Sequence, residues 1–109
     1  MIERVLPEIP VHFYKASSGT GPVLEWLRDL PREDRRSIGI DLMRVQVVRN
    51  IGDGLWEIRS TLPSRRIARL LLCFHEGAIV VLHGFIKKTQ KTPPDDLELA
   101  RKRKREVTG

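Results

Sequence analysis

The chain has 109 residues, which is enough for one domain with a modest core and too few for two. An apolar fraction of 40% excludes a disordered chain, and the single cysteine excludes an internal disulfide and a thiolate metal cluster. The net charge of +6 favours an anionic partner such as RNA, DNA or an acidic protein, although the same charge can simply keep a small protein in solution.

The N-terminal half predicts a short strand and two helices. Residues 10–15 (PVHFYK) form the expected strand, and the turn SSGTG follows it. Apolar residues recur with helical period from Pro22 to Leu30, and Pro31 interrupts the pattern. A second helix is expected from about Arg32 to Arg49, so the two helices should form a hairpin. The inward stripe of this second helix is Ile38, Leu42, Val45 and Val48.

The central part predicts three strands of one antiparallel sheet. Residues 50–54 (NIGDG) are dense in turn formers, and a strand follows at Leu55–Thr61. Two longer apolar runs, Ile67–His75 and Ala78–Phe85, flank the two-residue turn Glu76-Gly77 and indicate a hairpin. Cys73 lies inside one of these runs, where a buried, unreactive thiol is expected.

The last element is a helix that begins near Thr92. Thr92 is a suitable N-cap, and Pro93 suits the first helical position. The helix ends in the basic run RKRKR at 101–105. The order of strand, two helices, three strands and helix predicts a single α+β domain over residues 1–109.

Charged residues interrupt the predicted strands at regular places. Side chains alternate between the faces of a strand, so Trp56 and Ile58 suit the face that packs on the helices, and Glu57 and Arg59 lie on the other. Arg69 can share that second face on the next strand. His83 shares a face with Val81 and Phe85, and Lys87 and Lys88 follow just past the strand. One open face is therefore expected to carry this charged set: Glu57, Arg59, Arg69, His83, Lys87 and Lys88.

Such a set suits phosphate chemistry. Arg binds phosphate through a planar fork and Lys through a point charge, whereas His or Glu moves protons near neutral pH. Phe85 offers a ring on which a base can stack. Alternatively, Glu57 and Arg59 only pair with neighbouring charges of the sheet. The basic run offers contacts to phosphate backbone or is simply a solvated helix end: Arg101, Lys102, Arg103, Lys104 and Arg105.

Other sites are not supported. His12, His75 and His83 lack the spacing of metal ligands and have no neighbouring Cys or Asp cluster, so no metal is expected. GTG and GDG are too short for a dinucleotide or P-loop motif, so no other cofactor is expected. The longest apolar run is too short to span a bilayer, and the N-terminal MIERVLPEIP lacks the apolar region of a signal peptide. A cytoplasmic protein with no membrane partner is therefore expected.

Several strings together resemble one protein family. GLWEIRS at 54–60, ARLLL at 68–72 and VLHGFIKKTQKTP at 81–93 are similar to the phage-derived, HigB-like branch of the RelE toxin superfamily. FYKASSGTGPVLEWLRDLP at 13–31 resembles the opening strand and first helix of that family, so the resemblance covers nearly the whole chain. It implies a RelE-like α+β fold, in which a twisted antiparallel sheet packs against an N-terminal helical hairpin and a C-terminal helix follows.

The resemblance also implies an activity. Such proteins are toxins of type II toxin–antitoxin pairs that cut messenger RNA on the ribosome without a metal ion. The 2′-hydroxyl of the substrate attacks the adjacent phosphate and leaves a 2′,3′-cyclic phosphate and a 5′-hydroxyl. Arg59 and Arg69 match the family's strand arginines and would hold the scissile phosphate. Lys87 and Lys88 match its KK pair and would stabilise charge or transfer a proton, with Glu57 or His83 as the base.

The implied partners are the ribosome, messenger RNA and a small antitoxin with a helix-turn-helix domain, in a toxin–antitoxin hetero-oligomer. Many relatives carry a Tyr or His near the C-terminus, where this chain has none, so the general acid stays unassigned. The alternative is a non-catalytic basic module that binds RNA or the antitoxin.

Overall fold

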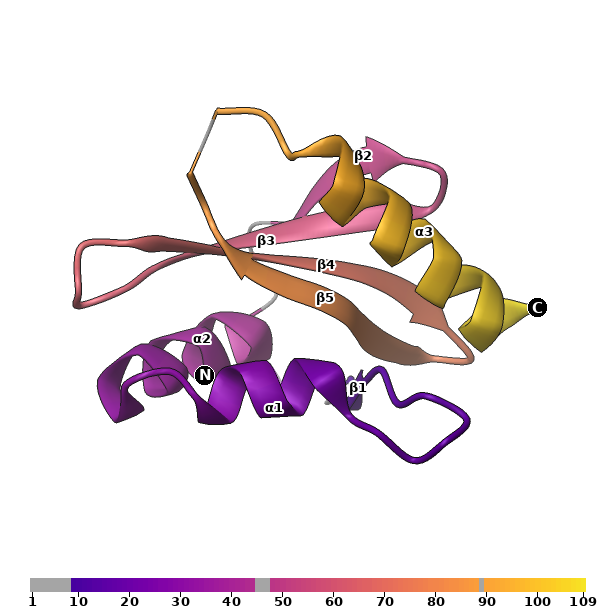
Figure 1. Cartoon of the computed structure of the whole chain (residues 1–109), viewed down its shortest axis with the longest axis horizontal. Coiled ribbons are helices and arrows are strands. Elements are labelled where there is room, and N and C mark those ends of the chain that lie inside the picture. The colour runs from indigo at the N-terminus through magenta and orange to yellow at the C-terminus, as the bar shows by residue number, and fades with distance from the viewer. Residues whose placement is uncertain (1–8, 45–47, 89) are drawn as a thin grey trace, which may run out of the picture.

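A computed structural model describes residues 9–44, 48–88 and 90–109. Its elements form three layers (Figure 1). Helices α1 (Pro22–Arg28) and α2 (Arg32–Arg44) lie against one face of a five-stranded sheet, and helix α3 (Pro94–Thr108) lies on the other face. The predicted α+β class, with a twisted sheet, two N-terminal helices and a C-terminal helix, is confirmed.

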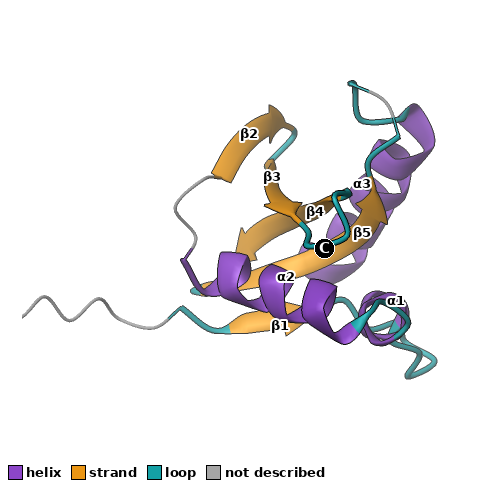
Figure 2. Cartoon of the chain, turned by 90° about the vertical axis from the view of Figure 1, so that its left-hand side faces the viewer, coloured by secondary structure: helices purple, strands orange, loops and turns teal. Residues whose placement is uncertain are grey.

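The sheet has the strand order β1-β5-β4-β3-β2. Its strands are β1 (Val11–Phe13), β2 (Val48–Gly52), β3 (Leu55–Thr61), β4 (Ile67–His75) and β5 (Ala78–Ile86). The pairings from β2 to β5 are antiparallel, whereas β1 runs parallel to β5 at one edge. Figure 2 shows α1 end-on beside one end of α2, which is seen lengthwise, so the axes of the two helices are not parallel.

The three central strands lie where the sequence predicts them. The bounds of β3 and β4 match the prediction, and β5 is longer by one residue. Glu76 and Gly77 have φ angles of 49° and 77°, the left-handed geometry of a tight hairpin turn. The turn chemistry therefore sets the register between β4 and β5.

The prediction of a helix up to Arg49 is wrong. Helix α2 ends at Arg44, and Val48 begins strand β2, which pairs with β3 through a turn at Asp53-Gly54. Of the predicted inward stripe, Ile38 and Leu42 are buried, and Val45 lies outside the described residues. The valine-rich stretch satisfies helical spacing, but β-branched residues followed by a turn also suit a strand, and pairing with β3 decides the outcome.

Two apolar clusters occupy the two sides of the sheet. The larger lies between the sheet and α1 and α2, and includes Ile58, Leu70 and Leu72 with Trp56 packed against it. The smaller lies between the sheet and α3, and contains Leu55, Leu71, Cys73, Val80, Leu82 and Ala100. The predicted orientation of Trp56 and Ile58 towards the helix pair is therefore confirmed, and Cys73 is buried as expected.

A β-bulge changes the orientation of the second half of β5. Leu71 pairs with His83 and Leu72 pairs with Val81, so Leu82 is an extra residue. Val81 packs in the α1/α2 cluster, whereas His83 contacts Asp96 of α3 and stacks on Phe85. The prediction that Val81 and His83 share a face is wrong because the extra residue reverses the alternation, and Phe85 does share the face of His83.

Candidate active site

Strand pairing brings the predicted strand charges together on the α3 side of the sheet. Glu57 lies opposite Arg49 of β2 and Leu71 of β4. The next pair on that side of β3 and β4 is Arg59 opposite Arg69. The structure thus joins residues 49, 57, 59 and 69, although they come from three strands.

Glu57 and Arg69 form the centre of a buried polar network. One carboxylate oxygen of Glu57 accepts a hydrogen bond from Arg59 Nε at 3.3 Å, and the other accepts one from the Thr92 hydroxyl at 3.0 Å. Arg69 Nη1 lies 3.9 Å from Glu57 Oε2 and donates to Thr92 Oγ1 at 3.1 Å. Arg69 Nη2 donates to the Gln90 carbonyl at 2.8 Å. The network therefore ties the segment before α3 to the sheet.

The prediction of an open face is wrong at this centre. Glu57 is 2% exposed and Arg69 is 1% exposed, whereas the side chain of Arg59 is 43% exposed. Residues 90–92 and the start of α3 cover the sheet here, because α3 packs its apolar residues on the neighbouring apolar part of the same face. Thr92 does not cap α3 as predicted, since Pro93 is the N-cap residue and the Thr92 hydroxyl is used by the network.

A cavity of about 300 Å³ opens onto this network. We call it the Glu57 cavity; its lining is Arg49, Ile51, Glu57, Arg69, Gln90, Lys91, Thr92 and Leu97. Arg69 Nε is buried and has no hydrogen-bond partner within the described part of the chain. A buried N–H without a partner is costly, so Arg69 Nε is an unsatisfied donor on a residue of the cavity wall.

Sequence reasoning missed several residues of the Glu57 cavity. Arg49 was assigned to a helix, and Thr92 to a helix cap. The stretch 50–54 holds the signal that could have found Arg49, although the turn is confined to Asp53-Gly54 and residues 50–52 belong to β2. A hairpin closed at that turn places Arg49 beside Glu57.

The Lys pair lies in a second cavity of about 420 Å³. We call it the four-cation cavity; its lining is Arg65, Arg66, Ile67, Lys87, Lys88 and Gln90. Gln90 lines both cavities, so they are neighbours. Lys87 and Lys88 are thus close to the candidate site, and they share their cavity with two arginines of the β3–β4 connection rather than with Glu57.

His83 is separated from the Glu57 cavity. Leu71 lies between Glu57 and His83 in the sheet. The His83 ring is 2.5 Å from Asp96 Oδ1 and stacks on Phe85 at a centroid distance of 5.4 Å. His83 and Phe85 therefore form a contact between β5 and α3, and neither lines the two cavities.

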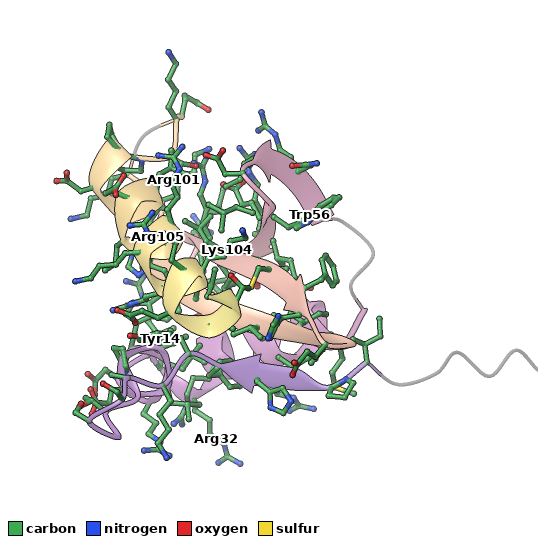
Figure 3. The ribbon with its side chains drawn as sticks, turned by 90° about the vertical axis from the view of Figure 1, so that its right-hand side faces the viewer. Tyr14, Arg32, Trp56, Arg101, Lys104 and Arg105 are labelled. Atoms are coloured by element: carbon green, nitrogen blue, oxygen red, sulfur yellow. The ribbon has the colours of Figure 1, made fainter. Side chains whose placement is uncertain are left out.

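The side chains of the five basic residues at 101–105 point in different directions around α3 and do not form one continuous surface. Figure 3 shows Arg101, Lys104 and Arg105 on this helix, with Tyr14 beside its C-terminal part. Arg101 pairs with Asp53 at 2.8 Å, and Lys102 is exposed. Arg103 donates to the Leu82 carbonyl at 2.9 Å, Lys104 approaches Gly54, and Arg105 pairs with Glu98 at 3.8 Å. Arg101 thus links α3 to the β2–β3 turn, and Arg103 links α3 to β5.

Three side chains near α3 have shifted pKa values. The hydrogen bond from the Tyr14 hydroxyl to Glu106 raises the pKa of Tyr14, with burial and the Glu106 charge acting in the same direction. Burial raises the pKa of the Cys73 thiol, and the charge of Lys104 partly opposes this rise. Burial lowers the pKa of Arg103, whose guanidinium lies 4.9 Å from the centre of the Tyr14 ring.

Within the described residues, His, Cys, Asp and Glu side chains form no group of three or more that could hold a metal ion. Among the described helices, none has the length and apolar character needed to cross a membrane.

A family model, phage-derived protein Gp49-like (DUF891), matches residues 25–105. The chain belongs to this family. Members of the Gp49-like family are associated with toxin–antitoxin systems and are similar to RelE and HigB. A comparison with curated proteins returned no match.

The matched region holds all the residues of the two cavities. Membership in the Gp49-like family supports a toxin-type role and an antitoxin partner. The RelE-like fold expected from the sequence is consistent with the observed architecture.

Proposed function

We propose that the chain is the toxin of a type II toxin–antitoxin pair and cleaves messenger RNA on the ribosome. The observation that supports this most strongly is the buried Glu57–Arg69 pair on the wall of a cavity that Arg49 and Lys91 also line. A carboxylate surrounded by cations combines a proton acceptor with groups that stabilise a phosphate, which is what RNA transesterification requires.

In the proposed reaction, the Glu57 carboxylate removes the proton of the substrate 2′-hydroxyl. The 2′-oxygen then forms a bond to the adjacent phosphorus, and the bond from phosphorus to the 5′-oxygen breaks. Arg69 and Arg59 stabilise the negative charge that builds on the phosphate oxygens. The leaving oxygen takes a proton, so the products are a 2′,3′-cyclic phosphate and a 5′-hydroxyl, and no metal ion takes part.

Glu57 is a better base than His83 because it lines the cavity that can hold the phosphate. His83 lies behind Leu71, and Asp96 and Phe85 hold its ring. For the acid, Lys91 lines the same cavity as Glu57, whereas Lys87 and Lys88 line the neighbouring one. Lys91 is therefore the best-positioned lysine for donating a proton to the leaving oxygen.

The proposed partners are an antitoxin with a helix-turn-helix domain, the ribosome and messenger RNA, within the cytoplasm. The net charge of +6 supports binding to ribosomal and messenger RNA, whose phosphates attract a cationic protein over a distance. The antitoxin would form a hetero-oligomer with the toxin and prevent cleavage.

The test is controlled expression of the wild type, Glu57→Gln and Glu98→Gln, followed by mapping of messenger ends. Glu57→Gln keeps the shape of the side chain and removes the proton acceptor, so cleavage should fall by about 10²- to 10⁴-fold. Glu98 is an exposed acid of α3, and its variant should cleave like the wild type. Wild type that leaves translated messenger intact, with no 5′-hydroxyl ends, would contradict the proposal.

The burial of Glu57 and Arg69 specifically favours one alternative, a non-catalytic module that binds RNA or the antitoxin. In such a module the pair would only hold residues 90–92 on the sheet. Growth arrest that survives both Glu57→Gln and Arg59→Ala, in proteins of unchanged melting temperature, would support this alternative. Loss of messenger cleavage in both variants, at unchanged melting temperature, would support the nuclease.

A further inference from the structure

The lining of the four-cation cavity is strongly basic. Its lining includes Arg65, Arg66, Lys87 and Lys88, and no Asp or Glu is among the described residues that line it. Four cations around about 420 Å³ repel one another, and an anion in the cavity would remove that repulsion.

Two of the four cations are held in place by neighbours. Arg66 Nη2 lies 3.3 Å from Oδ2 of Asp34, an α2 residue that is 1% exposed, and Arg66 Nε donates to the Ser64 hydroxyl at 3.2 Å. Lys87 Nζ donates to Gln90 Oε1 at 3.5 Å. Arg65 and Lys88 have no ion-pair partner within the described ranges, so their charges remain available to a ligand.

Arg65 has a backbone conformation that is unfavourable for a residue with a side chain. Its φ is +67°, in the left-handed region that favours glycine. Its N–H donates to the Leu62 carbonyl at 2.9 Å, and the Leu62 N–H donates to the Arg66 carbonyl at 2.9 Å, so the β3–β4 turn is closed tightly around it. Glycine would satisfy the turn better than arginine does. An arginine at this position is therefore consistent with a role of its side chain in ligand binding.

The position of the cavity indicates the kind of anion. The four-cation cavity and the Glu57 cavity share Gln90, so a ligand that extends through both must carry negative charge at more than one place. RNA has a phosphate on every nucleotide, and the arginine fork matches phosphate oxygens. An acidic protein segment would also be attracted to the cations. However, binding of such a segment would not explain why the four-cation cavity adjoins the cavity in which phosphate cleavage is proposed.

We propose that Arg65, Arg66, Lys87 and Lys88 form a phosphate-binding subsite for an RNA phosphate next to the scissile one. This inference rests on the function proposed above and extends it to the substrate strand. The subsite holds the strand so that the scissile phosphate enters the Glu57 cavity. Arg65 and Lys88 supply the charges that have no protein partner, and Arg66 and Lys87 are fixed in position before RNA binds.

The test measures binding of the full chain to a single-stranded RNA in which a 2′-deoxy residue at the cleavage position prevents the reaction. Arg65→Gly should weaken binding by about tenfold or more, the usual effect of one lost hydrogen bond to a charged group. It should also reduce the slope of log K against log salt by about 0.7, as expected for one lost phosphate contact in a single strand. Lys88→Gln should act in the same direction, and Arg65→Lys should restore most of the affinity.

Two controls keep a structural role separate from a binding role. Glycine suits the turn, so Arg65→Gly should melt at the same temperature as the wild type or higher, and a fall in melting temperature together with affinity would overturn the inference. Lys15→Ala also removes one charge, but the loop between β1 and α1 lies at the opposite end of the molecule from the β3–β4 turn (Figure 1). Lys15→Ala should leave affinity and salt slope unchanged.

The outcomes of these binding measurements test the subsite independently of the proposed nuclease activity. Unchanged RNA affinity and salt slope in Arg65→Gly and Lys88→Gln would overturn the subsite, even if Glu57-dependent cleavage is observed. Arg65-dependent binding of the uncleavable RNA would support the subsite even if the wild type cleaves nothing. Arg65-dependent binding of an oligoglutamate peptide, with no such dependence for RNA, would overturn the inference in favour of an acidic protein partner.

Discussion

The two faces of the sheet come from the same strands but have different contents. On the α1/α2 face, Ile58, Leu70 and Leu72 are at most 3% exposed and belong to one apolar cluster. On the α3 face, Leu55 and Leu71 pack beneath the helix, whereas Glu57 and Arg69 alternate with them on the same strands. One face thus supplies most of the apolar packing, and the other combines a small core with charged groups.

This difference shows how a small domain can hold buried charges. Burying an unpaired charge is very unfavourable, so Glu57 and Arg69 are buried together. Arg59, Thr92 and the Gln90 carbonyl form hydrogen bonds with them, and among the described residues Arg69 Nε alone is a buried side-chain donor without a partner. The larger cluster on the opposite face offsets the cost of that arrangement.

Removing one member of the buried pair should damage the protein more than removing both. Glu57→Ala leaves Arg69 buried without its charge partner and should lower the free energy of unfolding by about 3–5 kcal/mol. The double variant Glu57→Leu with Arg69→Met makes this part of the α3 face apolar, and should lose much less stability than Glu57→Ala alone. Urea unfolding measures both. Equal losses of unfolding free energy in the two proteins would mean that the attraction between Glu57 and Arg69 does not offset the cost of burying their charges.

Adding one methyl group on the α1/α2 face should have the next largest effect. A Cβ at Gly84 would lie 2.4 Å from Cζ3 of Trp26 on α1, which is too close for any contact. Gly84→Ala should therefore cost about 1–3 kcal/mol of unfolding free energy. Gly39 of α2 has no heavy atom within 4 Å of the same added atom, so Gly39→Ala is the matched control and should be neutral or stabilising. A neutral Gly84→Ala would contradict close packing on this face.

Loss of the contact that links the two faces should have a small, pH-dependent effect. Tyr14 packs in the α1/α2 cluster, and its hydroxyl donates to Glu106 of α3, which raises the pKa of Tyr14. A raised pKa means that this contribution is complete below the pKa of the unfolded tyrosine, near 10, and is lost as pH rises through the higher folded value.

The wild type should therefore lose its stability advantage over Tyr14→Phe as the pH rises from about 9 to above 10. The measurement is the melting temperature of both proteins over this pH range. Both proteins have the same lysines, so the effect of lysine titration cancels in the difference between the two melting temperatures. A difference that stays constant over this range would show that the Glu106 contact does not favour the protonated tyrosine.

Most of the fold can be predicted from the chain because its signals are local. Glu76-Gly77 marks a hairpin turn, and the alternation in β3 separates Ile58 from Glu57. The valine-rich residues after Arg44 fit both the helical and the strand period, so the sequence does not predict strand β2 or the position of Arg49 on it. The orientation of His83 could not be predicted because the bulge at Leu82 depends on pairing with β4.

By itself, the sequence determined the class of fold, the three central strands and the set of charges on one side of β3 and β4. These follow from side-chain periodicity, turn residues and composition, which act over a few neighbouring residues. The burial of Glu57 and Arg69, the contact of Thr92 with them, and the cavity that Lys87 and Lys88 line with Arg65 and Arg66 all depend on tertiary packing. Those outcomes depend on which distant segments pack together, and local patterns do not contain that information.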